Sequence, residues 1–224
     1  MSMNSNLDQA AVEQAARMDD IYGLQRHVYD ATRAHYLLGR DGLLANLDVP
    51  AGGSILEVGC GTGRNLVRAA RRYPDVKLFG LDISQEMLQS AGKSILQAGI
   101  ESRTKLGLAD AAKFDARQLF KKEKFDRVIF SYTLSMIPNW RGALQQGLEV
   151  LAPHGSLHLV DFGGCEQLPS WFRSALYAWL GKFHVTPRAE MEAYLQELAA
   201  AKGLRLEVAK PFRGYAIAAT LGFK

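Results

Sequence analysis

The chain has 224 residues, of which 48% are hydrophobic and 22% are charged. This is enough apolar material for one α/β domain with a full core and too little for two. No apolar stretch reaches the roughly 18–20 residues of a membrane span, and the polar, acidic first residues do not resemble a signal peptide. We therefore expect a soluble, cytoplasmic protein. The two cysteines, Cys60 and Cys165, form neither a metal-type spacing nor a disulfide framework.

The net charge of +4 is unevenly spread, with 15 Lys and Arg against 10 Asp and Glu in residues 113–224. A basic half favours an anionic surface such as lipid head groups or nucleic acid. The excess is modest, and an ordinary solvated face explains it at least as well.

Helical and extended patterns alternate after a helical N-terminal region. Apolar side chains recur at helical intervals over residues 7–47, and a turn at 50–53 follows. We predict strands over 54–58, 77–81, 104–108, 125–131 and 156–160, helices over 63–72, 84–98, 140–151 and 188–202, and a final strand pair over 204–209 and 214–221. Ser84 is the expected N-cap of its helix. Such alternation implies a parallel sheet with right-handed crossovers. The link 210–214 is too short for a crossover helix, so one strand of the last pair must run antiparallel.

A glycine-rich turn follows the first predicted strand. Gly59, Gly61 and Gly63 fall at i, i+2 and i+4, a spacing that lets a ligand lie against bare backbone. It is neither the G-x-G-x-x-G pattern nor a P-loop, whose lysine is missing. Asp82 ends the next predicted strand, where a carboxylate can accept both hydroxyls of a ribose.

Together these segments resemble motifs I and II of the class I S-adenosylmethionine-dependent methyltransferases. The resemblance implies an α/β fold: a Rossmann-like, seven-stranded, mostly parallel sheet with helices on both faces, one antiparallel strand near the C-terminus and an N-terminal helical cap. S-adenosylmethionine is the implied cofactor, with the glycine turn facing its methionine half, Asp82 its ribose and Asp110 its adenine. The predicted cofactor-binding residues are Tyr29, Arg33, Gly59, Cys60, Gly61, Asp82, Ile83, Met87, Asp110, Ala111 and Ser131. We expect one domain, with the cap over 1–50, the cofactor-binding core over 51–162, an aromatic insert or lid over 163–187 and a C-terminal helix and strand pair over 188–224.

Tyr22, Arg26, Tyr29 and Arg33 share one face of the predicted N-terminal helix, because they recur at i, i+4, i+7 and i+11. An arginine there could bind the methionine carboxylate, and a tyrosine ring could lie near the sulfonium or a cationic amine. The alternative is a surface helix with amphipathic side chains. Tyr22, Tyr29 and Tyr132 are the catalytic candidates around the accepting nitrogen, and no residue is assigned as an obligatory base.

A closer resemblance runs from about residue 20 to the C-terminus. The segments 29–40, 61–65, 134–140, 183–188 and 213–216 are similar to the methyltransferase that completes betaine-lipid synthesis. That family trimethylates the amine of diacylglyceryl-homoserine to give diacylglyceryl-trimethylhomoserine. The resemblance implies a lipid substrate, a peripheral position on the inner face of the membrane and an upstream enzyme that forms the homoserine lipid. The predicted substrate-binding residues are Arg26, Trp171, Arg213 and Tyr215.

Three alternatives to this function stay open. The first is a phosphatidylethanolamine N-methyltransferase, the second a soluble small-molecule N- or O-methyltransferase, and the third a cofactor-binding subunit without catalysis of its own. The segment Ser131-Tyr132-Thr133-Leu134 differs from the Asn/Asp-Pro-Pro-Tyr segment of enzymes that methylate bases, so we expect no nucleic-acid substrate. No cluster of His, Asp and Glu indicates a metal site.

An aromatic segment over residues 168–184 holds two of the three tryptophans, Trp171 and Trp179. Its strongly polar members are Arg173, Lys182 and His184. A helix of this composition can lie in a membrane interface, with Trp and Tyr at head-group level. It can also close over an active site, or pack as an ordinary core helix against the sheet.

Overall fold

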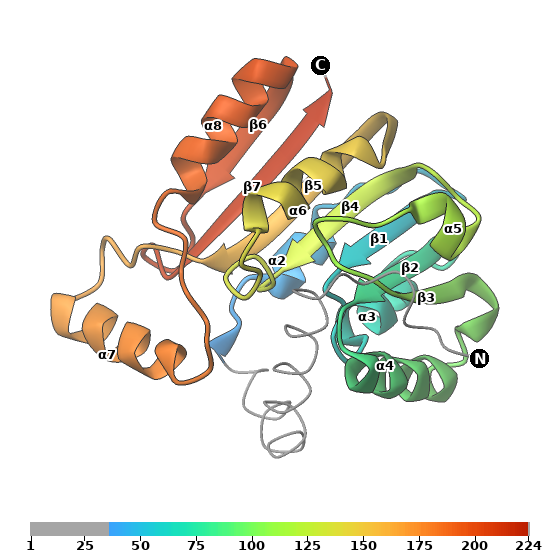
Figure 1. Ribbon diagram of the computed structural model, residues 1–224, viewed down its shortest axis with the longest axis horizontal. Helices are drawn as coiled ribbons and strands as arrows, with labels where there is room; N and C mark the ends of the chain where they lie inside the picture. Colours follow the sequence, from blue (N-terminus) through green and yellow to red (C-terminus); the bar gives the residue numbers. More distant parts are fainter. Residues whose placement is uncertain (1–35, 224) are drawn as a thin grey trace.

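The computed structural model describes residues 36–223, whose strands form one seven-stranded sheet (Figure 1). The strands are β1 (Ser54–Val58), β2 (Lys77–Asp82), β3 (Thr104–Leu108), β4 (Phe125–Ser131), β5 (Leu151–Phe162), β6 (Leu204–Ala209) and β7 (Ala216–Phe223). Their order is β3-β2-β1-β4-β5-β7-β6. The pairs among β1 to β5 are parallel, and β7 runs antiparallel to both β5 and β6. The predicted fold class is therefore confirmed, including its antiparallel C-terminal strand.

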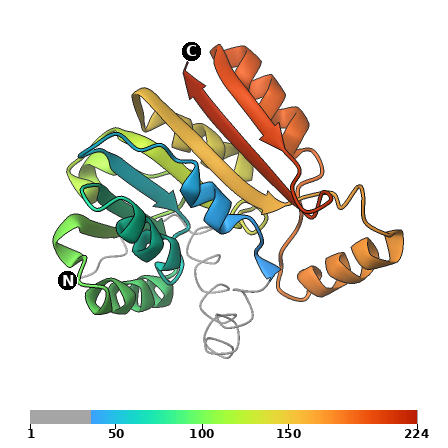
Figure 2. The same cartoon turned by 180° about the vertical axis from the view of Figure 1, so that it is seen from behind.

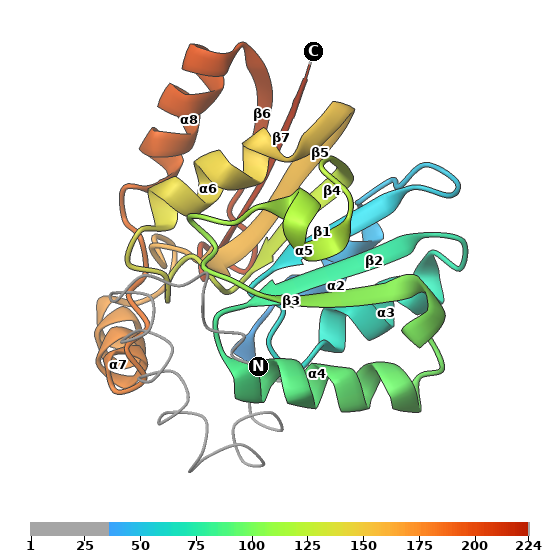
Figure 3. The same ribbon diagram turned by 45° about the vertical axis from the view of Figure 1, so that its right-hand side comes forward.

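Helices cover both faces of the sheet (Figure 3). The helices of the described residues are α2 (Arg40–Ala45), α3 (Arg64–Arg72), α4 (Gln85–Gln97), α5 (Ala116–Phe120), α6 (Trp140–Glu149), α7 (Ser170–Gly181) and α8 (Met191–Lys202). α2, α3 and α4 share one core cluster, and α5, α6 and α8 share the other. β4 contributes side chains to both clusters. Ile129 belongs to the first, and its neighbours Val128 and Phe130 belong to the second, because side chains alternate between the two faces of a strand.

The observed bounds depart from the prediction most clearly at β5, at α8 and at β7, which spans Ala216–Phe223 rather than 214–221. β5 begins at Leu151 rather than 156, because Leu151 pairs with Phe125 and a register shift then carries the chain past Pro153 and Gly155. α8 begins at Met191 rather than 188, because the residues before it form a turn in which the Met191 N–H donates to the Arg188 carbonyl at 3.1 Å. The five-residue helix α5 was not predicted. Of the predicted N-terminal helix, only its end at α2 falls among the described residues.

α7 projects from the body of the molecule beyond the carboxyl end of β5 (Figures 1 and 2). Its inner face packs through partly or fully buried Phe172, Leu176, Tyr177 and Leu180, while most of its other side chains are exposed. No helix in the part of the chain described is both long and apolar enough to cross a membrane.

Candidate functional site

A cavity of about 310 Å³ lies beyond the carboxyl ends of the central strands. It opens where the strand order reverses between β1 and β4, which is the position that ligands occupy in open α/β sheets. The predicted site residues that line it are Gly59, Cys60, Gly61, Asp82, Ile83, Asp110, Ala111, Ser131 and Tyr132. Site residues that were predicted in four separate segments of the sequence thus line one cavity.

The glycine turn presents backbone to the cavity. The N–H groups of Gly59 and Cys60 both donate to the Leu81 carbonyl, at 2.8 and 2.9 Å, which ties the turn to β2. Gly59 has φ +72°, and a Cβ there would lie 2.2 Å from the Thr133 side chain. Gly61 has φ +52°, and a Cβ there would meet nothing within 4 Å. Any side chain at Gly61 would therefore occupy open space that the bare backbone leaves for a ligand.

Asp82 is held at the cavity by two backbone N–H groups. Its Oδ2 accepts from Gly61 at 2.8 Å, and its Oδ1 accepts from Ser84 at 3.0 Å. Ser84 in turn caps α4, because its Oγ accepts from the Met87 N–H at 3.2 Å, as predicted for this residue. The turn between β2 and α4 thus fixes the orientation of the carboxylate next to the glycine turn.

Asp110 and Ala111 form the opposite edge of the cavity, after β3. Asp110 Oδ1 accepts from the Ala112 N–H at 2.8 Å, so its side chain organises its own turn. The Ala109 N–H donates to the Asp82 carbonyl at 3.0 Å. This bond brings the ends of β2 and β3 together and places both carboxylates on one cavity.

The end of β4 contributes Ser131 and Tyr132. Ser131 Oγ is buried without a hydrogen-bond partner among the described residues. Tyr132 has φ +55°, and its hydroxyl donates to the Leu38 carbonyl at 2.6 Å. Burial raises the pKa of this phenol well above its usual value. Tyr132 therefore stays neutral, and its hydroxyl is engaged with the backbone rather than free in the cavity.

Glu57 is the site residue that sequence reasoning missed. It is fully buried at the end of β1, and burial raises its pKa from 4.5 to about 8 against the opposing effects of Asn65 and Arg40. Oε1 accepts from Asn65 Nδ2 at 2.7 Å, and Oε2 has no partner in the described structure. Its signal was an acid inside an otherwise apolar strand that leads into the glycine turn.

The cavity also has walls that were not predicted. Arg40 and Arg64 line it beside Glu57, and Leu37, Met136 and Ile137 form an apolar side. Met136 follows β4 in a turn whose Ile137 carbonyl accepts from Arg188 at 2.8 Å. These wall residues lie in the segments 29–40 and 134–140, but the similarity of those segments to a known family did not indicate that they line the cavity.

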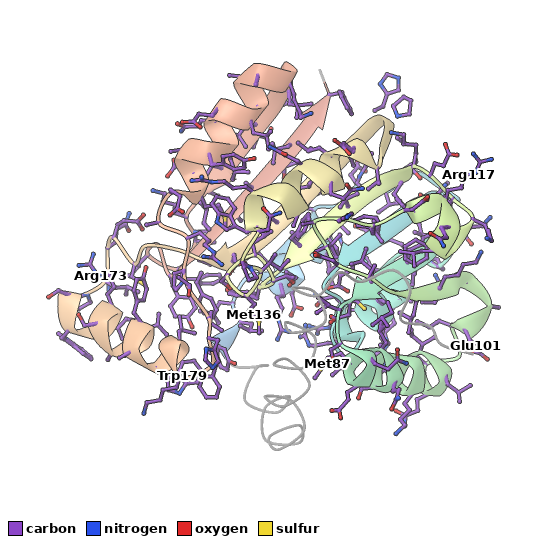
Figure 4. The ribbon with its side chains drawn as sticks, in the orientation of Figure 1. Met87, Glu101, Arg117, Met136, Arg173 and Trp179 are labelled. Carbon is purple, nitrogen blue, oxygen red and sulfur yellow. The ribbon has the colours of Figure 1, made fainter. Side chains whose placement is uncertain are left out.

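An apolar seam joins this cavity to α7. Its lining residues are Tyr36, Leu37, Tyr132, Met136, Phe162, Trp179, Leu180, Phe183 and Val185, of which Leu37, Tyr132 and Met136 also line the cavity. The Trp179 ring lies 4.8 Å from that of Tyr36 and 5.1 Å from that of Phe183. Figure 4 shows Met136 between Trp179 of α7 and Met87 of α4. The seam is narrow in this conformation, with room of only about 10 Å³.

The remaining predicted site residues do not line the cavity, or lie outside the described residues. Tyr22, Arg26, Tyr29 and Arg33 belong to the latter group. Met87 is buried in α4, and Trp171 is 71% exposed on α7. Arg213 lies in the exposed link between β6 and β7. Tyr215 is buried and donates to the Tyr36 carbonyl at 2.9 Å, so it supports the start of the described chain.

A family model described as a methyltransferase domain matches residues 50–202. The chain belongs to this family. The cofactor of the family is S-adenosylmethionine, as the motifs predicted.

The curated relatives act on different acceptors. A phosphatidylethanolamine N-methyltransferase of Cereibacter sphaeroides is 32% identical over 110 residues, which are 49% of this chain and 51% of that protein. The methyltransferase GfsG of Streptomyces halstedii is 29% identical over 119 residues, 53% of this chain and 41% of that one. The chain thus spans about half the length of these relatives or less. A demethylmenaquinone methyltransferase of Geobacillus kaustophilus is 26% identical over 204 residues, 88% of this chain and 80% of its own.

Solved structures share the fold. The methyltransferase SibL has a TM-score of 0.67 and 20% identity over 96% of this chain and 70% of its own. A phosphoethanolamine N-methyltransferase of Haemonchus contortus, solved with phosphomonomethylethanolamine and S-adenosylhomocysteine, has a TM-score of 0.69 and 18% identity over 88% of this chain and 46% of its own.

The residues present fit S-adenosylmethionine. Gly61 offers a backbone cradle that a Cβ would fill, and Asp82 and Asp110 supply carboxylates suited to hydroxyl and amine donors. Two buried oxygen atoms on the cavity, Glu57 Oε2 and Ser131 Oγ, lack partners among the described residues. Buried polar atoms are rarely left unsatisfied, so a ligand with N–H, O–H or cationic groups suits this lining.

Proposed function

We propose that the protein transfers methyl groups from S-adenosylmethionine to the amine of a lipid head group. The proposed acceptor is diacylglyceryl-homoserine, and the product is diacylglyceryl-trimethylhomoserine. An upstream enzyme that forms the homoserine lipid would supply the acceptor. The similarity of residues 134–140 and 183–188 to the betaine-lipid methyltransferases supports this acceptor.

The observation that carries the proposal is the seam between the cavity and α7. All nine of its lining residues are apolar or aromatic, and none is charged. An acceptor that reaches the cavity along this seam has an apolar part next to its reacting amine. A small polar metabolite would gain nothing from such a lining, whereas the hydrocarbon of a lipid would be buried there once side chains of the seam, which now has room of only about 10 Å³, move apart.

The side chains of the cavity position the reactants and exclude water. S-adenosylmethionine supplies a methyl group on a sulfonium, whose leaving group is neutral and good. The protein therefore contributes mainly orientation and desolvation. Leu37, Met136 and Ile137 keep water from one side, and the neutral Tyr132 ring suits an amine that becomes cationic as it is methylated. The amine itself must be deprotonated before it reacts.

A second acceptor is favoured by one specific observation. The relative from Cereibacter sphaeroides is named as a phosphatidylethanolamine N-methyltransferase. Phosphatidylethanolamine also joins a primary amine to a diacyl body, so the same seam suits it. It differs from the homoserine lipid in having a phosphodiester instead of an ether between glycerol and head group, and in having no carboxylate beside its amine.

The test is an assay of the purified protein with labelled S-adenosylmethionine and each of the two lipids, and with free homoserine as a soluble control. We expect mono-, di- and trimethylated products on diacylglyceryl-homoserine. Methylation of phosphatidylethanolamine alone would contradict the homoserine lipid as acceptor and favour phosphatidylethanolamine instead. Methylation of free homoserine at the same rate would contradict the lipid reading, because the seam would then contribute nothing.

A further inference from the structure

We propose that the outer face of α7, together with the exposed residues Phe212 and Arg213, lies in the head-group layer of an anionic bilayer. The α7 face consists of Trp171, Ala175, Trp179 and Lys182 of this helix region together with Phe212 and Arg213. The inference rests on the proposed function for the identity of the substrate. Its evidence is the composition and position of the surface itself.

The exposed apolar side chains are concentrated on the α7 face. The large hydrophobic residues that the described structure exposes are Leu96, Trp171, Trp179, Phe212 and Phe223. Three of these five belong to the α7 face, and Trp171 is the most exposed, at 71%. Trp171, Ala175 and Lys182 lie on one side of α7 by helical spacing, opposite the buried Leu180. Tryptophan at the edge of an apolar surface is typical of membrane interfaces.

The charge of this surface selects an anionic partner. Residues 167–189 contain no Asp or Glu. Lys182 on the outer side of α7 and Arg213 in the adjoining link are both exposed. The acids that flank this segment, Glu166 and Glu190, are paired with Lys210 at 3.0 Å and with Arg141 at 3.8 Å. A face with exposed tryptophan, basic side chains and locally engaged acids is complementary to an anionic lipid layer.

The position of the α7 face brings the cavity to the bilayer. The link that carries Phe212 and Arg213 lies beside the root of α7, because the Gln167 N–H donates to the Arg213 carbonyl at 3.2 Å and the Cys165 N–H to the Gly214 carbonyl at 2.8 Å. Trp179 is 36% exposed and also lines the seam that leads to the cavity. A lipid surface on α7, which projects from the body of the molecule (Figures 1 and 2), would thus lie next to Trp179 and the seam that it lines.

Co-sedimentation of the full chain with vesicles tests the proposal. The probes are vesicles of phosphatidylcholine alone and of phosphatidylcholine mixed with phosphatidylglycerol. We expect binding to the mixed vesicles that decreases with added salt, and much weaker binding to the neutral ones. Absence of binding to the anionic vesicles, or equal binding to both kinds, would overturn it.

Two matched pairs of variants locate the surface. Trp171→Ser should weaken vesicle binding by about tenfold or more. Phe223→Ser should leave it unchanged, because Phe223 is also exposed, at 49%, but ends β7 at the opposite end of the sheet. Lys182→Glu should weaken binding by about fivefold or more, whereas Lys77→Glu, at the exposed amino end of β2, should not. Equal effects within either pair would overturn the assignment.

The outcome is distinct from that of the proposed function. Anionic vesicles bound through Trp171, with neither lipid methylated, would support the α7 face and contradict the proposed acceptor. If the wild type methylated a lipid but Trp171→Ser bound vesicles as strongly as the wild type, the proposed acceptor would be supported and the α7 face would be contradicted. Thermal unfolding of each variant checks that it is folded, which we expect because the substituted side chains are exposed.

Discussion

At the scale of single residues, the cofactor half of the cavity is made from backbone as much as from side chains. The Gly61 N–H fixes the Asp82 carboxylate, and the bare Cα of Gly61 leaves the space beside it open. The spacing of the glycines and the position of Asp82 are visible in the sequence, so this part of the site was predictable. Its essential feature is the absence of a side chain.

Gly61→Ala should therefore affect both folding and cofactor binding. An L-residue at φ +52° costs about 1–2 kcal/mol of stability, and the added methyl group enters the cavity. Gly52→Ala is the matched control, since Gly52 has φ +68° with nothing within 4 Å of a Cβ and lies in an exposed turn. Urea unfolding should show similar losses in both variants. Isothermal titration with S-adenosylmethionine should show weaker binding only for Gly61→Ala. Equal affinities of the two variants would contradict the proposal that the cofactor lies against the bare backbone of Gly61.

Glu57 shows where prediction from sequence stops. Its identity and place before the glycine turn were plain, but its raised pKa and unpartnered Oε2 depend on burial by the helices around β1. The same holds for the apolar wall of Leu37, Met136 and Ile137, whose segments resemble a known family but whose place on the cavity depends on packing. Motif spacing specifies the residues of one turn, whereas packing between distant elements specifies the rest of the cavity.

At the scale of elements, the turn after β4 is held in place by the segment that follows α7. Arg188 donates to the carbonyls of Leu134 and Ile137, at 3.2 and 2.8 Å. The Ser135 N–H donates to the buried Asp161 carboxylate at 3.1 Å, and the Thr186 N–H donates to the Ser135 carbonyl at 2.9 Å.

Arg188→Ala should loosen this wall. Losing a charged donor that bridges two carbonyls costs roughly 1–3 kcal/mol of stability, and Met136 and Ile137 would lose their fixed position. We expect a lower midpoint of urea unfolding and a raised KM for the acceptor. Arg117→Ala is the control, because that side chain is 78% exposed and its ion pair with Glu123 is at the surface. A wild-type midpoint in Arg188→Ala would show that the anchor is unimportant.

The lengths of most strands followed from the sequence, and the exceptions have identifiable causes. β1, β3, β4 and β6 have the predicted bounds. β5 is longer because pairing with β4 continues past Pro153, which alone reads as a turn. Tertiary pairing overrode the local signal there.

At the scale of the whole molecule, two buried groups give the stability opposite dependences on pH. Burial raises the pKa of Glu57 from 4.5 to about 8, so the native state binds more protons than the unfolded state between these values, and stability falls as pH rises through them. Burial lowers the pKa of His158 from 6.5 to about 4. His158 therefore costs stability as pH falls from 6.5 towards 4.

The predicted signature is the difference between Glu57→Gln and the wild type. Its free energy of unfolding relative to wild type should increase by about 2 kcal/mol between pH 6.5 and pH 8, because the variant no longer has to release a proton from a buried carboxyl. The free energy of unfolding of His158→Gln should instead rise relative to that of the wild type as the pH falls below 6.5. Urea unfolding at a series of pH values measures both, and a pH-independent difference for Glu57→Gln would show that its carboxyl is not perturbed.

The central claim of this account is that the cavity at the β1–β4 switch binds S-adenosylmethionine. The most direct measurement is isothermal titration of the purified protein with S-adenosylmethionine, alongside Asp82→Asn and the exposed control Asp75→Asn. We predict one site per chain, with a Kd raised about tenfold or more by Asp82→Asn and unchanged by Asp75→Asn. No binding by the wild type, or the same Kd in Asp82→Asn, would contradict the claim.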